Sequence, residues 1–242
     1  MGVMLGKESA ITAVFAHRGC TDGFTENTLE AFAEARRLGA DGVELDVRLT
    51  ADSALAVHHD PLVAGLGPLA ELTVPELPGH IPLLVDALAV CEGMVVNVEI
   101  KNDPREPGHD PGETVAALTA AAIAEAGWVD RVIVSSFQPS TLRAVQAADG
   151  RLPLGVLWSF LTDVEAGLEM AVAEGWAAVH PFVPDATPKL VEQAQAAGLA
   201  VNVWTVNGSQ DLMALVELGV EAVITDRLVD ALSIAHGADE RE

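Results

Sequence analysis

The sequence predicts an α/β protein with the (β/α)8 architecture of a TIM barrel. Short runs rich in Val, Ile and Leu alternate along the chain with Ala-rich stretches of helical length. A glycine repeatedly ends a helix just before an apolar strand, in GADGVEL at Gly39, GWAAVHP at Gly175 and GVEAVIT at Gly219. We expect one domain over residues 1–242, with a short acidic C-terminal tail from about residue 236.

Nine segments have strand character: Thr12–His17, Gly42–Arg48, Ala54–His59, Met94–Lys101, Val132–Ser136, Leu154–Trp158, Ala177–His180, Val201–Val206 and Ala222–Thr225. Only LTADS separates the second segment from the third, whereas a parallel crossover needs about a dozen residues or more. The third segment is therefore expected to fold back on the second as a short antiparallel hairpin. Eight parallel strands remain, which is the number that closes the barrel.

The hairpin brings two histidines back toward the second strand. If its turn centres near residues 51–52, the numbers of paired residues sum to about 103. His59 then lies beside Glu44 and Val57 beside Asp46, with room for a slip of a residue or two. His58 is expected to face away from its neighbour, because side chains alternate along a strand.

The first helix carries its own start signal. Asn27 and Glu30 have the spacing of a capping box. Leu29, Phe32, Ala35 and Leu38 then form one apolar stripe. The helix is therefore expected to be capped at Asn27.

The composition limits the partners and the compartment. With 13 basic and 36 acidic side chains the formal charge is −23, which repels nucleic acid and anionic membranes. No apolar run reaches the roughly 18 residues of a membrane span. Cys20 and Cys91 are too few for a disulfide framework, and the N-terminus lacks the pattern of a signal peptide. We expect a cytoplasmic protein without nucleic acid or stable membrane contacts; the oligomeric state stays open.

Acidic residues alternate with aliphatic residues on two predicted strands. In GVELDV, Glu44 and Asp46 lie on the same face of the strand. In VVNVEIK, one face of that strand carries Asn97, Glu99 and Lys101. The aliphatic faces suit the surrounding helices, so the carboxylates point into the barrel near its C-terminal mouth. A solvated strand end bound to Arg or Lys is an alternative for the first pair, disfavoured because basic residues are scarce. Glu99 and Lys101 alone could form an internal ion pair.

Taken together, the three carboxylates predict a site for one hard divalent cation. Like charges placed side by side need a shared proton or a cation, and oxygen ligands favour Mg²⁺ or Ca²⁺, with Mn²⁺ as a further candidate. The chain lacks the clustered cysteines and histidines of a zinc site.

The dipeptide of His17 and Arg18 ends the first strand at the same mouth, where TIM-barrel active sites lie. By itself it could be a satisfied polar pair. Beside the carboxylates, His17 and His59 suit a general acid and base. Arg18 offers a bidentate fork for a phosphate and Lys101 a point charge. Together these groups suit phosphoryl chemistry.

The motifs HRG, ENTLEAF, GADGVELDVRLTAD, HHDP, VEIK, SSF, VWTVN and ITD, in this order from His17 to about Asp226, closely resemble the glycerophosphodiester phosphodiesterase family. The resemblance implies a (β/α)8 barrel that hydrolyses glycerophosphodiesters to glycerol phosphate and an alcohol with a divalent cation. It implies that Glu44, Asp46 and Glu99 hold the metal and that His17 and His59 are the acid/base pair. It also implies that Arg18 and Lys101 bind the phosphate and that Trp204 is a wall of the pocket.

One region departs from the family. After HHDP, members usually carry an insertion with an Arg-Thr-Thr-Gly-rich stretch that covers the site. Here the segment LVAGLGPLAELTVPELPGHIPLLVDAL is short and lacks that stretch. Two other readings stay open: a phospholipase D-like or lysophospholipase D-like enzyme on the same barrel, and an inactive phosphodiester-binding protein. His180 is a rim residue that could touch substrate, while His80, His109 and His236 are expected at the surface.

Overall fold

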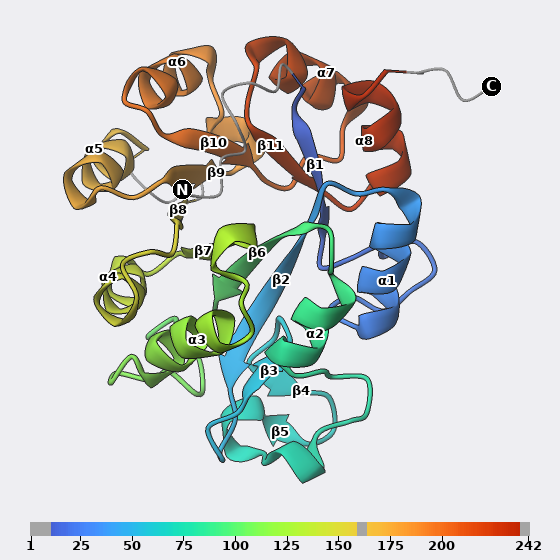
Figure 1. The fold of residues 1–242 in the computed structure, drawn as a ribbon, viewed down its shortest axis with the longest axis vertical. Helices are drawn as coiled ribbons and strands as arrows, with labels where there is room; N and C mark the ends of the chain where they lie inside the picture. Colours follow the sequence, from blue (N-terminus) through green and yellow to red (C-terminus); the bar gives the residue numbers. More distant parts are fainter. Residues whose placement is uncertain (1–10, 159–163, 238–242) are drawn as a thin grey trace.

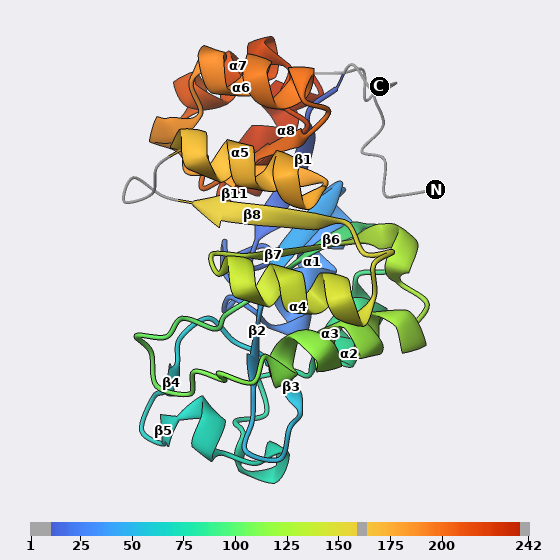
Figure 2. The ribbon, with the colours of Figure 1, turned by 90° about the vertical axis from the view of Figure 1, so that its left-hand side faces the viewer.

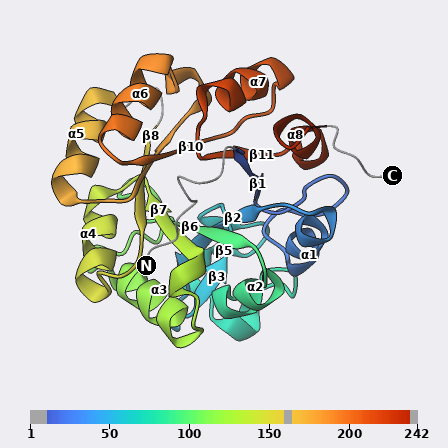
Figure 3. The same cartoon turned by 45° about the horizontal axis from the view of Figure 1, so that its top comes forward.

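The computed structural model describes residues 11–158 and 164–237, which form a closed barrel of parallel strands ringed by helices (Figures 1 and 3). The barrel strand β1 pairs with both β2 and β11, and this double pairing closes the ring. The predicted (β/α)8 fold is confirmed. In ring order the parallel strands are β1 (Ala13–His17), β2 (Gly42–Leu49), β6 (Val95–Ile100), β7 (Val132–Ser136), β8 (Leu154–Trp158), β9 (Ala178–Pro181), β10 (Ala200–Val203) and β11 (Ala222–Thr225).

The helices cover the outside of the barrel. Outward strand residues such as Val43, Leu45 and Val47 are fully buried beneath them, which places the alternate residues of each strand inside. Gly39 and Gly219 end helices in the left-handed conformation, with φ of 86° and 70°, as the recurring phrase predicts. The helices are α1 (Leu29–Leu38), α2 (Leu84–Val90), α3 (Thr114–Glu125), α4 (Pro139–Ala148), α5 (Val164–Glu174), α6 (Pro188–Ala196), α7 (Ser209–Leu218) and α8 (Leu228–Ala235). Within the described ranges, no helix is long and apolar enough to cross a membrane.

The hairpin forms as predicted, with its register shifted by one residue, within the slip that the prediction allowed. Strand β3 (Leu55–Val57) runs antiparallel to β2, and Val57 lies opposite Val47, not Asp46. The turn holds residues 51–53: the Thr50 N–H donates to the Ala54 carbonyl at 3.0 Å, the Ala54 N–H donates to Thr50 Oγ1 at 2.8 Å, and Ser53 has a φ of 64°. The strand also ends at Val57, before the predicted His59.

The segment after β3 makes a small insertion at one end of the molecule (Figure 2). It contains β4 (Leu62–Val63), β5 (Gly67–Pro68) and two short 3-10 turns, η1 (Leu69–Glu71) and η2 (Val74–Glu76). Its own apolar cluster consists of Ala56, Val63, Leu69 and Ile81. The insertion therefore packs as a compact unit over the end of β2.

The predicted capping box of the first helix is wrong. Helix α1 is capped by Thr28, whose Oγ1 accepts a hydrogen bond from the Ala31 N–H at 3.2 Å. Asn27 instead adopts a left-handed backbone with φ of 56° and turns its side chain into the barrel mouth. Of the predicted tail, His236 and Gly237 lie within the described residues and 238–242 do not. His236 forms an ion pair with Asp41 at 3.1 Å.

Candidate active site

Three buried carboxylates meet inside the C-terminal mouth of the barrel. Glu44 and Asp46 lie on β2 and Glu99 on β6, where Glu99 is the register partner of Asp46. Each carboxylate offers one oxygen, and these oxygens lie within 4.8 Å of one another. We call this group the carboxylate cluster. It forms because alternate residues of two neighbouring parallel strands face the same interior.

Two cations partly neutralise the carboxylate cluster. The Lys101 ammonium lies 3.0 Å from Asp46 Oδ1 and also contacts Glu99. Lys101 therefore pairs with both carboxylates and not with Glu99 alone. Arg18 Nε lies 3.3 Å from Asp46 Oδ2. Burial opposes ionisation of Asp46, but Lys101 and Arg18 outweigh it and hold the pKa of this carboxyl well below its usual range.

Glu44 is the least compensated member of the cluster. Its Oε2 accepts a hydrogen bond from the Arg18 N–H at 3.1 Å, while its Oε1 is buried without a hydrogen-bond partner among the described residues. Burial, reinforced by the charge of Asp46, raises the pKa of Glu44 to about 8. Three converging carboxylates with one orphaned oxygen fit a hard divalent cation, because a bound cation would satisfy that oxygen and relieve the repulsion.

Asn27 aligns Asp46, a role that the sequence did not reveal. Its Nδ2 donates to Asp46 Oδ2 at 2.7 Å, and its Oδ1 accepts the Asp46 N–H at 3.3 Å. The Asn27 N–H donates to the Arg18 carbonyl at 2.9 Å. This loop residue therefore fixes one oxygen of Asp46 and leaves Oδ1 facing the cluster. Asn is one of the few residues that tolerates a left-handed backbone, which was the available signal.

His17 lies at the end of β1 with a carboxylate behind it. Its Nδ1 is 2.7 Å from Asp226 Oδ1, and its Nε2 is 3.8 Å from Glu44 Oε2. Asp226 is held in turn by Asn207, whose Nδ2 donates to Asp226 Oδ2 at 2.7 Å. Burial lowers the pKa of His17, but the hydrogen bond to Asp226 and the charge of Glu44 outweigh it, so the pKa is raised.

Asp226 and Asn207 were not predicted as site residues. Asp226 directly follows β11, whose Thr225 is the register partner of Ala16. Neighbouring parallel strands of a closed barrel end at the same mouth, so this position was the signal that could have identified Asp226.

The two hairpin histidines take different directions. His59 is a third exposed and its Nδ1 lies 2.8 Å from Asp60 Oδ1; it is near enough for its charge to act on Asp46. The pKa of His58 is lowered by burial, and the backbone of Leu62 in the insertion acts against this shift, so the His58 ring lies on the side of the insertion. The His58 N–H donates to the Asp46 carbonyl at 3.0 Å.

Trp204 belongs to an aromatic wall that reaches the charged side of the mouth. Its ring lies 5.4 Å from that of Phe137, edge to face, and 5.2 Å from that of Phe182. The Lys101 Nζ lies 5.9 Å from the centre of the Phe137 ring. The wall therefore stands beside the lysine that contacts the carboxylate cluster.

His180 is not the rim residue that the sequence suggested. It is fully buried inside the barrel, with its Nε2 3.1 Å from Asn202 Nδ2. Burial lowers its pKa to about 3, which keeps the imidazole neutral. Its carbonyl accepts a hydrogen bond from Trp204 Nε1 at 2.9 Å, so His180 supports the aromatic wall from below.

Comparison with known proteins agrees with this geometry. Residues 17–230 match the model of the glycerophosphoryl diester phosphodiesterase family. The glycerophosphodiester phosphodiesterase of Caldanaerobacter subterraneus is 33% identical over 89% of this chain and 94% of its own, and that of Bacillus altitudinis 31% over 89% and 95%. A crystal structure of a putative glycerophosphoryl diester phosphodiesterase from Silicibacter pomeroyi superposes with a TM-score of 0.84, at 27% identity, over 93% of both chains. The resemblance seen in the motifs is confirmed: the chain is an enzyme of the glycerophosphoryl diester phosphodiesterase family.

Proposed function

We propose that the enzyme hydrolyses small glycerophosphodiesters to glycerol 3-phosphate and an alcohol, by general acid/base catalysis with His17 and His59. The observation that carries the proposal is the convergence of His17, Arg18 and Lys101 on the carboxylate cluster at one barrel mouth. Family membership supports the reaction class. The buried site lies in a strongly acidic chain of charge −23, so Arg18 and Lys101 supply the local positive charge that a phosphodiester requires.

In the proposed reaction, a water oxygen attacks phosphorus while the bond from phosphorus to the alcohol oxygen breaks. His17 accepts the proton of the water through Nε2, because Nδ1 bonds Asp226 and the carboxylate stabilises the imidazolium that forms. His59 donates a proton to the departing alcohol oxygen. Arg18 and Lys101 bind the phosphate oxygens, and Trp204 forms a wall of the pocket.

Glu44, Asp46 and Glu99 are the proposed ligands of one divalent cation, Mg²⁺ or Ca²⁺, with Mn²⁺ as a further candidate. Such a cation would supply electrophilic stabilisation of the phosphate charge. The whole chain, residues 1–242, is proposed to act as one catalytic domain in the cytoplasm, without nucleic acid or stable membrane contacts. The charge of −23 supports this, because it disfavours both polyanions and anionic lipid.

The test is a substrate panel with the purified protein. Glycerophosphocholine, glycerophosphoethanolamine and glycerophosphoglycerol are incubated with enzyme and Mg²⁺ or Ca²⁺, and glycerol 3-phosphate and free alcohol are quantified. We expect both products in equal amounts from at least one substrate. Release of phosphocholine would contradict the proposal, because it breaks the bond on the glycerol side of the phosphate. Activity on lysophospholipids alone would also contradict it and would favour the phospholipase D-like or lysophospholipase D-like alternative. No turnover of any diester would favour the binding-protein alternative.

Arg18→Lys is expected to lower kcat/KM at least about tenfold, and Arg18→Ala more. Lysine keeps the charge but cannot reproduce the planar fork, and a hydrogen bond to a charged group contributes about 1.5 to 3 kcal/mol. Steady-state kinetics on the preferred substrate measure the loss. Arg37→Lys on α1, where the exposed Arg37 pairs with Glu34 of the same helix, is the control. Wild-type efficiency of Arg18→Lys would show that Arg18 supplies charge alone.

A further inference from the structure

Arg48 is a buried cation at the barrel mouth that the proposed reaction does not use. It is the third charged side chain on the inner face of β2, two residues beyond Asp46, and only 8% of its side chain is exposed. A buried guanidinium is costly unless its donors are paired. The groups that pair with the Arg48 guanidinium therefore indicate the role of this residue.

The guanidinium joins two loops that flank the site. Arg48 Nε donates to the His59 carbonyl at 2.7 Å, and Nη2 donates to Glu106 Oε2 at 2.8 Å. His59 lies at the return of the hairpin, and Glu106 lies in the loop between β6 and α3. Because the guanidinium is planar and rigid, the two bonds fix the direction of the His59 carbonyl relative to the second loop.

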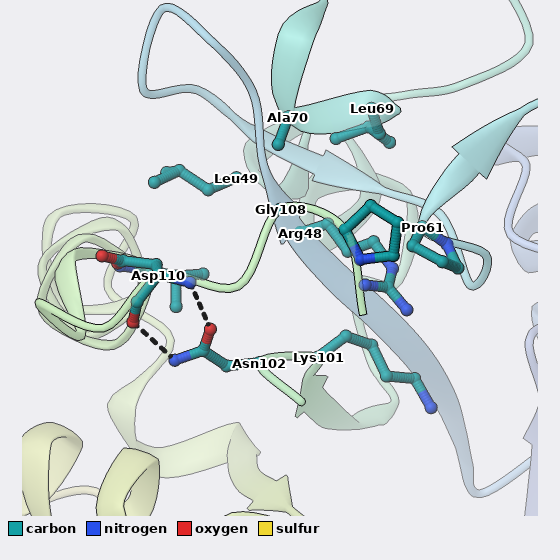
Figure 4. A pocket seen from close by; sticks show the side chains of 11 residues that line it. Arg48, Leu49, Pro61, Leu69, Ala70, Lys101, Asn102, Gly108 and Asp110 are labelled. Carbon is teal, nitrogen blue, oxygen red and sulfur yellow. Dashed lines mark hydrogen bonds between the residues drawn. The ribbon is translucent and has the colours of Figure 1, made fainter. Parts of the chain in front are cut away.

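The second loop is itself firmly held. Asn102 Nδ2 donates to the Asp110 carbonyl at 3.0 Å, and the Asp110 N–H donates back to Asn102 Oδ1 at 2.8 Å (Figure 4). Gly108 has a φ of +84°, and a Cβ there would lie 2.6 Å from the Ala70 side chain of the insertion. The loop and the insertion thus pack in close contact around a small pocket that Arg48 and Lys101 help to line.

Among the described residues, the backbone hydrogen bonds nearest to His59 join its neighbours: the Leu69 N–H donates to the Pro61 carbonyl at 2.9 Å, two residues after it. Strand β3 ends at Val57, and the bond from the His58 N–H to the Asp46 carbonyl lies one residue before His59. The His59 ring is a third exposed, and its partner Asp60 is 69% exposed. A surface bond of this kind contributes little rigidity. The bond from the buried Arg48 side chain to the His59 carbonyl is part-buried, so it constrains the His59 main chain more strongly than the surface contact with Asp60 does.

We propose that Arg48, held by Glu106, is a positioning residue for His59: it sets the imidazole at the distance required to protonate the leaving oxygen. The inference rests on the proposed role of His59 as the general acid. A displacement of about 1 Å in such a group can cost about 10²-fold in rate. Removing the Arg48 bonds to the His59 carbonyl and to Glu106 should therefore slow proton donation more than it weakens phosphate binding.

The test compares leaving groups. Arg48→Met removes both bonds and keeps the apolar stem, while Glu106→Gln removes only the charge of the anchor. We expect Arg48→Met to lower kcat on glycerophosphocholine about 10- to 100-fold and to leave the p-nitrophenyl diester of glycerol phosphate within about threefold, because p-nitrophenolate leaves without a proton. Glu106→Gln should show the same selectivity, more weakly. The control is Arg143→Met, which removes an exposed pair with Glu174 on the outer helices and should change neither rate.

A second measurement is independent of turnover. Hydrogen exchange of the segment 57–63 should be faster in Arg48→Met than in wild type, while β1 and β2 stay protected. An equal loss on both substrates, or unchanged exchange in this segment, would overturn the proposal and leave Arg48 a purely structural residue. His59→Ala is measured alongside. If it lacks leaving-group selectivity, the assignment of His59 as the acid fails, and the exchange data alone then decide whether Arg48 holds the segment.

Discussion

His59→Ala is expected to lose about 10² to 10⁴ in turnover of glycerophosphocholine but to retain most of the wild-type rate on a p-nitrophenyl diester. The reason is that an alkoxide must be protonated as it leaves, whereas p-nitrophenolate need not be. His17→Ala is expected to lose a similar factor on both substrates, because the attacking water must be deprotonated whichever group departs. The measurement is kcat for each variant on each substrate.

Two controls make the comparison interpretable. Cation binding, measured by calorimetry, should be the same in both variants as in wild type, because neither histidine is a proposed ligand. His236→Ala should leave both rates unchanged. His236 lies at the far end of α8 from Asp226 and pairs with Asp41, away from the proposed site. Recovery of both site variants on the p-nitrophenyl substrate, or of neither, would contradict the division of roles between His17 and His59.

Removal of divalent cations is expected to abolish activity, and Mg²⁺, Ca²⁺ or Mn²⁺ should restore it. Without a cation, no group among the described residues satisfies the orphaned oxygen of Glu44, and the electrophilic stabilisation of the phosphate charge is lost. The measurements are the rate in EDTA, its recovery with each ion, and the bound metal by elemental analysis. Full activity in excess chelator, with no metal detected, would remove the cation from the proposal.

Glu44→Gln should weaken cation binding and at the same time stabilise the cation-free fold at alkaline pH. Since the pKa of Glu44 is raised from 4.5 to about 8, the native state holds a proton that the unfolded state releases. Wild-type stability therefore falls as the pH rises from about 4.5 to 8, and glutamine removes that loss. Thermal unfolding in EDTA at pH 5 and pH 9 measures it: the variant should gain at pH 9, by about 2 to 4 °C per kcal/mol. A variant less stable than wild type at pH 9 would contradict this.

The barrel and its carboxylates could be predicted from local pattern alone. Strand alternation determines which face a residue occupies, so Glu44, Asp46 and Glu99 could be assigned to the interior before any pairing was known. The five-residue link LTADS excluded a parallel crossover and fixed the strand count. These inferences depend only on neighbours within a few residues.

The contacts that were missed depend on loop backbones and distant partners. Asn27 meets Asp46 across 19 residues and His17 meets Asp226 across 209, and no periodicity marks a loop side chain. The hairpin register is shifted by one residue because its turn holds residues 51–53, with Ser53 in a left-handed conformation. The sequence suggested a rim position for His180 because it lies at the end of its predicted strand. In the structure, Gly155 on the neighbouring strand β8 has no side chain, which leaves room for the His180 ring inside the barrel.

The closure of the ring between β1 and β11 also bears on biosynthesis. The histidine of the first strand acquires its carboxylate from a residue near the other end of the chain, so a nascent polypeptide contains no paired His17 until Asp226 has left the ribosome. During the tens of seconds that synthesis of such a chain can take, the edges of the growing sheet stay open to water and to chaperones. A truncated chain that ends before β11 would lack both the strand that closes the barrel and Asp226, the partner of the proposed base His17. Incomplete translation would therefore give a protein without hydrolase activity.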